Sequence, residues 1–257
     1  MRNKNTMSPI RNTEWEASLS ALAGGSIQAY DVIDSTNLCA KEWARDGANH
    51  GDWVIAARQI SGRGRLGRTF ESPENAGVYM TVILFPEEEK IPLLTVAAAV
   101  AVSQAIEEKA GVRAGVKWVN DLILDGLKIC GILAEGVISP DGKRGAVVGI
   151  GVNLKKDALP DSLAKIAGAL DGDIPRDSLA ACIREKLVSC VNAEKKRLIE
   201  TYRSLSILTG KTVNYCEGGV WKTGTATDIG GDGELIVQDS EGNFHALIAG
   251  EVTMHRE

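Results

Sequence analysis

Three short apolar runs in the first third of the chain are typical of β-strands. They are rich in β-branched and aliphatic side chains and cover residues 27–33, 53–60 and 78–85. After the first run, Asp34-Ser35-Thr36-Asn37 offers several helix N-cap candidates, so a helix is predicted over residues 38–45. The tetrapeptide therefore lies at a strand-to-helix corner. The segment between the second and third runs is a connection on a sheet.

The middle of the chain combines a long apolar helix with further strands. Residues 91–110 are rich in alanine and valine and end at Gly111, which predicts a buried helix with a glycine stop. Apolar runs follow over residues 115–118, 128–137 and 146–154. They are joined by the turn signals Asp125-Gly126 and Pro140-Asp141-Gly142, which favour antiparallel hairpins. The order predicts an α+β fold with a mixed, mainly antiparallel sheet rather than a doubly wound parallel sheet.

The character of the chain changes after residue 206. Residues 175–202 carry apolar side chains at helical spacing and predict one or two amphipathic helices. From residue 207, glycine turns separate short strands over residues 212–215, 223–228, 235–238 and 244–248, which is typical of a small β-barrel. We therefore divide the chain into an N-terminal extension (1–26), a main domain (27–206) and a C-terminal barrel (207–257).

Composition and charge indicate a cytoplasmic protein. The net charge of −5 over 257 residues argues against bulk nucleic acid as the main partner, which would select for a basic face. The five cysteines are scattered and form no CxxC pair, so free thiols in a reducing compartment are expected. The polar start lacks the apolar core of a signal peptide, and residues 91–110 are expected to be a core helix and not a membrane span.

A loop rich in glycine and arginine stands between the second and third strands. Residues 62–68, the Gly/Arg loop, contain Gly62, Arg63, Gly64, Arg65, Leu66, Gly67 and Arg68. Glycine lets backbone N–H groups approach an anion, and guanidinium groups bind phosphate or carboxylate oxygens in pairs. By composition alone, a small anionic ligand is no better supported than a solvated basic turn or a nucleic-acid contact.

A second polar segment follows the long helix. Lys117-Trp118-Val119-Asn120-Asp121 precedes the Asp125-Gly126 turn, and Lys128 follows it. Two strands joined by this turn would bring Asp121 and Lys128 across from each other. Taken alone, the pair is best explained as a cross-strand salt bridge. Together with the Gly/Arg loop, it indicates a binding site for a charged ligand.

These segments together resemble biotin protein ligases. The resemblance rests on residues 34–37, on the Gly/Arg loop, on 117–121 with Lys128, on 131–135 (Gly131-Ile132-Leu133-Ala134-Glu135) and on 149–154 (Gly149-Ile150-Gly151-Val152-Asn153-Leu154), which occur in that family's order and spacing. Each motif is weak alone, but the ordered set is highly specific, and it covers residues 27–154. It implies the fold of the class II aminoacyl-tRNA synthetase and biotin synthetase group, with a C-terminal SH3-like domain.

The resemblance assigns binding roles to individual residues. It implies that Ser35, Thr36, Asn37 and Gln59 hold the bicyclic ring of biotin, while Arg63, Gly64 and Arg65 contact its carboxylate and the α-phosphate of ATP. Lys128 would lie against the same reacting groups, with Lys117, Asn120, Asp121 and Asn153 nearer the nucleotide, its Mg²⁺ or the acceptor. Gly62 and Gly131 complete the cofactor-binding set. Phe70 stands where an aromatic ring stacks on adenine in some members, although tryptophan is usual there.

The implied reaction has two steps. Biotin attacks the α-phosphate of ATP to give biotinyl-5′-AMP, and a lysine of a biotin carboxyl carrier domain, part of a carboxylase, then displaces AMP. Arg65, Lys117 and Lys128 are the expected catalytic cations, because fixed positive charge stabilises the phosphoryl oxygens. Asp121 is either a proton acceptor or an orienting group, and the sequence leaves both open. No metal ligand is assigned.

Three other functions remain as alternatives. Lipoate ligases and octanoyltransferases of the same superfamily carry an Arg-Arg-x-Ser-Gly-Gly-Gly loop, which is absent here. A biotin-responsive regulator would need an N-terminal DNA-binding module, for which the 26 residues before the first strand give too little room. An inactive binding module is disfavoured because all the expected charged positions are occupied. A homodimer formed sheet to sheet, as in related enzymes, is left open. The resemblance also implies that the glycine-acid strand Gly250-Glu251-Val252 faces the active site.

Overall fold

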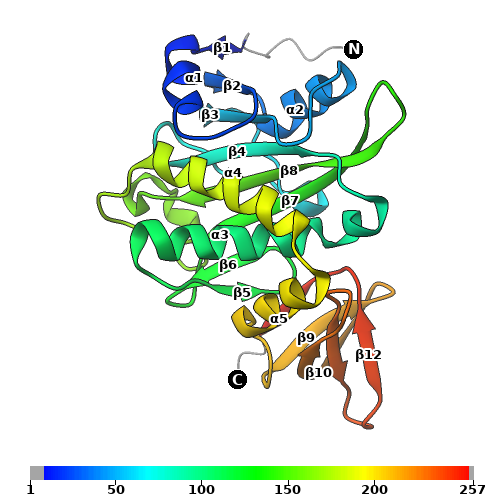
Figure 1. The fold of residues 1–257 in the computed structure, drawn as a ribbon. Coiled ribbons are helices and arrows are strands. Elements are labelled where there is room, and N and C mark those ends of the chain that lie inside the picture. The colour runs from blue at the N-terminus through cyan, green and yellow to red at the C-terminus, as the bar shows by residue number, and fades with distance from the viewer. Residues whose placement is uncertain (1–8, 255–257) are drawn as a thin grey trace, which may run out of the picture.

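The structure, a computed structural model, describes residues 9–254 and contains two β-sheets (Figure 1). The main sheet has eight strands in the order β1-β2-β3-β4-β8-β7-β6-β5. Their bounds are β1 Ile10–Arg11, β2 Ile27–Ile33, β3 Trp53–Gln59, β4 Gly77–Leu84, β5 Gly115–Lys117, β6 Asp121–Leu124, β7 Leu127–Ile138 and β8 Arg144–Asn153. Only β2 and β3 pair in parallel, and the other neighbours are antiparallel. The predicted mixed, mainly antiparallel α+β fold is confirmed.

Helices cover both faces of the main sheet. The helices are α1 Thr13–Ser20, α2 Thr36–Arg45, α3 Leu94–Ala110, α4 Arg176–Asn192 and α5 Lys195–Leu205, with 3-10 turns η1 Arg65–Gly67, η2 Glu88–Leu93, η3 Lys156–Ala158 and η4 Asp161–Leu163. α3 and α4 pack together on one face (Figure 1). On the other face, Ala40 and Ala44 of α2 pack against Val54, Ile83 and Val147 of the sheet. This second layer fixes the start of α2 beside the strand ends.

The predicted long helix is present but begins later than expected. Residues 88–93 form the 3-10 turn η2, which contains Pro92, and α3 then runs from Leu94 to a left-handed glycine stop at Gly111 with φ 68°. Together, Glu88–Ala110 is long and apolar enough to cross a membrane, with a mean hydropathy of 1.4. However, 67% of its 18-residue apolar stretch is buried inside the protein, as expected for a core helix.

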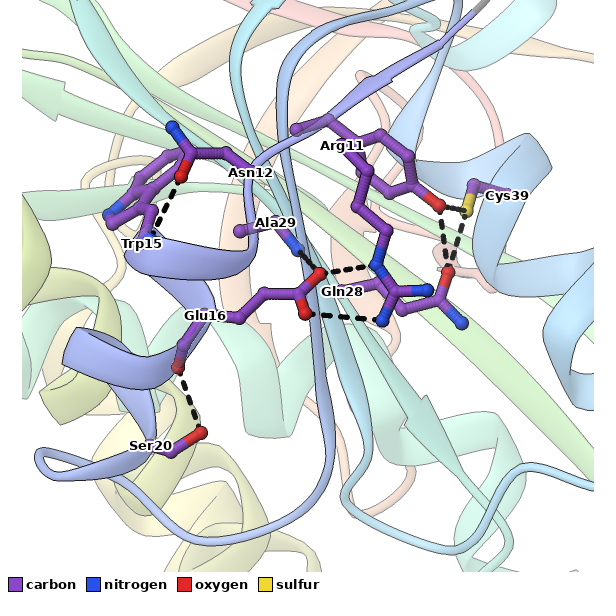
Figure 2. A network of polar contacts seen from close by, with 9 residues as sticks. Arg11, Asn12, Trp15, Glu16, Ser20, Gln28, Ala29 and Cys39 are labelled. Atoms are coloured by element: carbon purple, nitrogen blue, oxygen red, sulfur yellow. Dashed lines mark hydrogen bonds and ion pairs between the residues drawn. The ribbon is translucent and has the colours of Figure 1, made fainter.

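The polar N-terminal segment is part of the main sheet, which the sequence did not anticipate. β1 pairs with β2, and Trp15 and Leu19 of α1 are buried in the core. Glu16 accepts hydrogen bonds from Arg11 Nε (2.6 Å) and from the Ala29 N–H (2.9 Å), which fastens this segment to β2 (Figure 2). The expected extension is therefore integrated into the fold from residue 9 onward. Residues 1–8 lie outside the described residues.

The C-terminal sheet has one strand more than predicted. Its strands are β9 Thr212–Glu217, β10 Val220–Ile229, β11 Leu235–Gln238, β12 Phe244–Leu247 and β13 Val252–Met254, in the order β12-β11-β10-β9-β13. Within residues 9–254, β12 and β13 do not pair with each other, so the sheet is antiparallel but not a closed barrel. Trp118 Nε1 donates to the Gly233 carbonyl oxygen (2.9 Å) and joins this sheet to the main domain. The boundary near Ser206 stays a prediction.

Candidate active site

A cavity of about 890 Å³ opens where the main sheet meets the C-terminal sheet. Its walls come from the start of α2, the end of β3, the Gly/Arg loop, strands β5 to β8 and β13. The predicted site residues that line it are Ser35, Thr36, Asn37, Gln59, Arg63, Gly64, Arg65, Phe70, Lys117, Asn120, Asp121, Lys128, Gly131 and Asn153. Residues far apart in the sequence therefore converge on one cavity, as the resemblance implied.

Gly62 is the predicted site residue that does not line the cavity. A Cβ atom at this position would stand 2.2 Å from the Phe70 carbonyl oxygen. The Phe70 N–H also donates to the Gly62 carbonyl oxygen (2.9 Å). Gly62 therefore serves the close approach of two backbone segments at the base of the Gly/Arg loop, and its role in ligand binding stays a prediction.

One end of the cavity is a buried corner of hydroxyl and amide groups. The Thr36 N–H and hydroxyl both donate to Gln59 Oε1, at 2.8 and 3.0 Å. Gln59 Nε2 donates in turn to Ser72 Oγ (2.8 Å). Ser35 is 1% exposed, and its Oγ has no hydrogen-bond partner among residues 9–254. Because a buried polar atom without a partner is costly, this hydroxyl is suited to a ligand.

Asn37 is held from both sides. Its Oδ1 accepts from Thr81 Oγ1 (2.7 Å), and its Nδ2 donates to Glu135 Oε2 (2.8 Å). Glu135 also contacts Lys41 Nζ (2.6 Å) and lies 3.6 Å from Arg63 Nη2. Sequence reasoning assigned no role to Lys41 or Glu135. The available signals were the position of Lys41 one helical turn after Asn37 and the place of Glu135 at the end of the 131–135 motif.

The ionisation of Glu135 depends on this network. Burial opposes its negative charge, but hydrogen bonds from Lys41 and Asn37 outweigh burial, so the pKa of Glu135 lies below its ordinary value of 4.5. A lowered pKa contributes stability that is present above pH 4.5 and is lost as the pH falls through the lowered pKa.

We expect Glu135→Gln to lower the free energy of unfolding at pH 7 and to have a shrinking effect as the pH falls below 4.5. Urea unfolding of both proteins at a series of pH values measures this difference. In a Lys41→Met background the pH dependence should weaken, because the main cation facing Glu135 is gone. A constant difference at every pH would show that the charge of Glu135 adds no stability.

The other end of the cavity gathers positive charge. Lys128 Nζ lies 2.7 Å from Asp121 Oδ1, in contact but without hydrogen-bond alignment at that oxygen. The pair is diagonal, because Lys128 stands opposite Ile123 while Asp121 stands opposite Gly131. The expected proximity is confirmed, and a register shift after Leu122 accounts for the offset.

The Gly/Arg loop contributes Arg65 and Arg68 to the same end, whereas Arg63 lies beside Glu135. Arg65 Nη1 donates to Asn120 Oδ1 (2.9 Å), and Arg65 Nη2 donates to the Gly250 carbonyl oxygen (3.1 Å). Arg68 forms an ion pair with Glu251. The predicted approach of the 250–252 segment to the site is therefore confirmed by direct contacts.

Glycines form the floor of the cavity. Gly131 and Gly151 face each other across β7 and β8. The Phe70 ring rests on this pair, so a Cβ atom at Gly151 would stand 2.4 Å from it. A Cβ atom at Gly149 would stand 2.1 Å from Asn37 Oδ1. Phe70 lines the cavity as predicted, packed on backbone and edge-to-face against Tyr79 at 6.5 Å between ring centroids.

Fold and site together define a class of protein. A buried corner of hydroxyl and amide groups suits a neutral polar ring, and the cations of the opposite end suit carboxylate and phosphate. Between them lies a glycine floor long enough for an extended ligand. These features define a binding site for a ligand with a neutral polar ring and an anionic end.

Comparisons with known proteins identify the family. The model of the Biotin/lipoate A/B protein ligase family matches residues 29–153. The bifunctional ligase/repressor BirA of Bacillus subtilis is 35% identical over 228 residues, which cover 83% of this chain and 69% of that protein. The biotin–[acetyl-CoA-carboxylase] ligase of Mycobacterium tuberculosis is 29% identical over 247 residues, 90% of each chain.

The fold of a solved relative agrees. The biotin protein ligase from Aquifex aeolicus, in complex with biotin and ATP, superposes with a TM-score of 0.76 at 26% identity and covers 90% of this chain and 99% of that one. This chain belongs to the Biotin/lipoate A/B protein ligase family, and its relatives group it with the biotin ligases.

Proposed function

We propose that this chain converts biotin and ATP to biotinyl-5′-AMP and transfers biotin to a lysine of a biotin carboxyl carrier domain. The observation that carries the proposal is the unpartnered Ser35 hydroxyl, buried beside Thr36 and Asn37, at the opposite end of one cavity from Arg65 and Lys128. The ureido group of biotin can donate and accept hydrogen bonds, so it satisfies this corner. Its carboxylate then extends toward the cations.

The adenylation step requires two anions to meet. A carboxylate attacking the α-phosphate places extra negative charge on the phosphoryl oxygens, and fixed cations lower that barrier. Lys128, Lys117 and Arg65 line the end of the cavity where this charge would develop. Asp121 holds Lys128 in place, and Asn120 holds Arg65, before the substrates arrive.

Mg²⁺ would accompany ATP in this step. Within residues 9–254, no group of three or more His, Cys, Asp or Glu side chains is arranged to hold a metal ion. Mg²⁺ commonly binds through substrate phosphates and only one or two protein oxygens. Asp121 and Asn153 supply oxygens in the cavity wall that fit this mode, and the ion would neutralise phosphate charge there.

The transfer step requires biotinyl-5′-AMP, a mixed anhydride that water hydrolyses, to survive until the carrier domain arrives. The Gly/Arg loop lines the cavity, and its closure over the bound intermediate would exclude water from the reacting end. A lysine amine must be neutral to attack the acyl carbon, and Asp121 is the carboxylate in the cavity nearest to Lys128. We propose that Asp121 either accepts the proton that the acceptor lysine loses or orients Lys128.

The proposed acceptor is the carrier domain of a carboxylase, and the proposed compartment is the cytoplasm. The Mycobacterium tuberculosis relative is named for acetyl-CoA carboxylase, so the proposed acceptor here is the carrier domain of a carboxylase of that kind. The five cysteines are free thiols, as expected for a reducing cytoplasm. We propose neither a nucleic acid nor a membrane as a partner.

The central experiment compares two acids. The chain is incubated with ATP, Mg²⁺, a purified carboxyl carrier domain and either biotin or lipoate, and the carrier mass is measured. We expect one biotin adduct per carrier domain and none with lipoate. An adduct formed with lipoate, or the absence of an adduct with biotin, would show that the proposal is wrong. A carrier domain whose acceptor lysine is replaced by arginine serves as the control and should remain unmodified.

A further inference from the structure

The Gly/Arg loop is held by the C-terminal sheet at two points. Arg65 Nη2 donates to the Gly250 carbonyl oxygen (3.1 Å), and the Arg68 guanidinium pairs with the Glu251 carboxylate. Gly250 and Glu251 come directly before β13, an edge strand of that sheet. Two of the three arginines in the loop are therefore fastened to a part of the chain about 185 residues away.

The Gly250–Glu251 segment is itself fixed in place. Val252 is 5% exposed and pairs with Tyr215 of β9, whose side chain is fully buried. The Cys216 N–H donates to the Glu251 carbonyl oxygen (3.2 Å). The Glu251 carboxylate is thus presented to the Gly/Arg loop from a backbone anchored in the core of the sheet.

The effect of this fastening reaches Arg65. The Arg65 guanidinium lies between Asn120 Oδ1 on the main sheet and the Gly250 carbonyl oxygen on the C-terminal sheet, and Arg65 also lines the cavity. Arg68 is three residues further along and ends the 3-10 turn that begins at Arg65. Release of Arg68 would free this turn to carry Arg65 away from the cavity.

We propose that Glu251 is a positioning residue of the active site. By holding Arg68, it keeps the Gly/Arg loop closed and the Arg65 guanidinium at the end of the cavity that receives carboxylate and phosphate. The C-terminal sheet is thereby a working wall of the site and not only a packing cap. This inference rests on the proposed function, because a closed loop matters only if the site must retain biotinyl-5′-AMP.

The expected effect of losing the Arg68–Glu251 ion pair follows from the exposure of its two side chains. The Arg68 and Glu251 side chains are 71% and 30% exposed. Exposed ion pairs shift a local equilibrium by up to about fivefold and are screened by salt. Loss of the pair should therefore change how often the loop opens while leaving the fold intact.

The test compares Glu251→Gln with Glu217→Gln in the full chain. Glu217 is a matched control, because it is an exposed acid of the same sheet that pairs with Lys222 at 2.7 Å, outside the cavity lining. Two quantities are measured at low and at high salt: the rate at which bound biotinyl-5′-AMP is lost, and the amide hydrogen exchange of the peptide covering residues 62–70.

For Glu251→Gln we expect adenylate to be lost about three- to fivefold faster and residues 62–70 to exchange faster, with both differences fading at high salt. Glu217→Gln should match the parent protein. The charge exchange Arg68→Glu with Glu251→Arg should restore part of the retention, as expected if the ion pair itself holds the loop.

Two outcomes separate this inference from the proposed function. If the parent protein forms adenylate and Glu251→Gln retains it at the parent rate with unchanged exchange, the role of Glu251 is wrong and the proposed function stands. If the parent protein forms no adenylate, the proposed function is wrong, and unchanged exchange at residues 62–70 would still overturn the fastening of the loop by Glu251.

Discussion

Lys128→Ala is expected to slow the formation of biotinyl-5′-AMP by about 10²- to 10³-fold, the cost of removing one preorganised charge-stabilising group. Lys128 Nζ is held 2.7 Å from Asp121 Oδ1 and lines the cavity at its cationic end. Without it, negative charge on the α-phosphoryl oxygens would meet the Asp121 carboxylate unshielded. The variant therefore loses an attractive charge and exposes a repulsive one.

The adenylation rate is measured by single turnover with radiolabelled ATP, before any carrier domain is added. Lys143→Ala is the control, because Lys143 is exposed and pairs with Asp141 in the β7–β8 turn, outside the cavity lining. It should react at the parent rate. A Lys128→Ala protein that forms adenylate normally but fails to transfer it would show that Lys128 serves the second step.

Gly149→Ala is expected to raise the KM for biotin by about 10- to 100-fold, the equivalent of the 1–3 kcal/mol typical of overpacking. The new methyl group would stand 2.1 Å from Asn37 Oδ1 and would push the Asn37 amide out of its place between Thr81 and Glu135. Because the change lies at the polar corner, the KM for ATP should move little.

Steady-state kinetics with varied biotin and varied ATP separate the two effects of Gly149→Ala. Gly136→Ala is the matched control: Gly136 lies on the neighbouring strand β7, and a Cβ atom there meets nothing within 4 Å. An unchanged KM for biotin in Gly149→Ala, or an equal rise for both substrates, would remove Asn37 from biotin recognition.

Local patterns in the sequence were sufficient for most of the main sheet, whereas most residues of the cavity wall were assigned from the family resemblance. The Asp125-Gly126 turn brought Lys128 near Asp121 because a tight hairpin allows few registers. α2 begins at Thr36, two residues earlier than predicted, but its N-cap candidates still placed Ser35, Thr36 and Asn37 at a strand-to-helix corner.

Long-range contacts between side chains could not be predicted in the same way. Glu135 reaches Lys41 and Asn37 across more than 90 positions, and no local signal distinguishes it from a solvated acid. The N-terminal strand was missed because β1 has only two residues, both exposed. The pattern of glycine turns did not predict β13, because its three residues gain their pairing from β9, and only the resemblance pointed to a strand at residues 250–252.

The glycine floor has a consequence for altering the range of acids that this enzyme accepts. Where Gly131 and Gly151 face each other, the Phe70 ring rests on main chain, which cannot be trimmed to make room. Bulkier acids could be admitted only by shortening side chains that rest on this floor, such as the Phe70 ring. The range of acids is thus limited by replaceable side chains such as Phe70, because a Cβ atom added at Gly149 or Gly151 would clash with its neighbours.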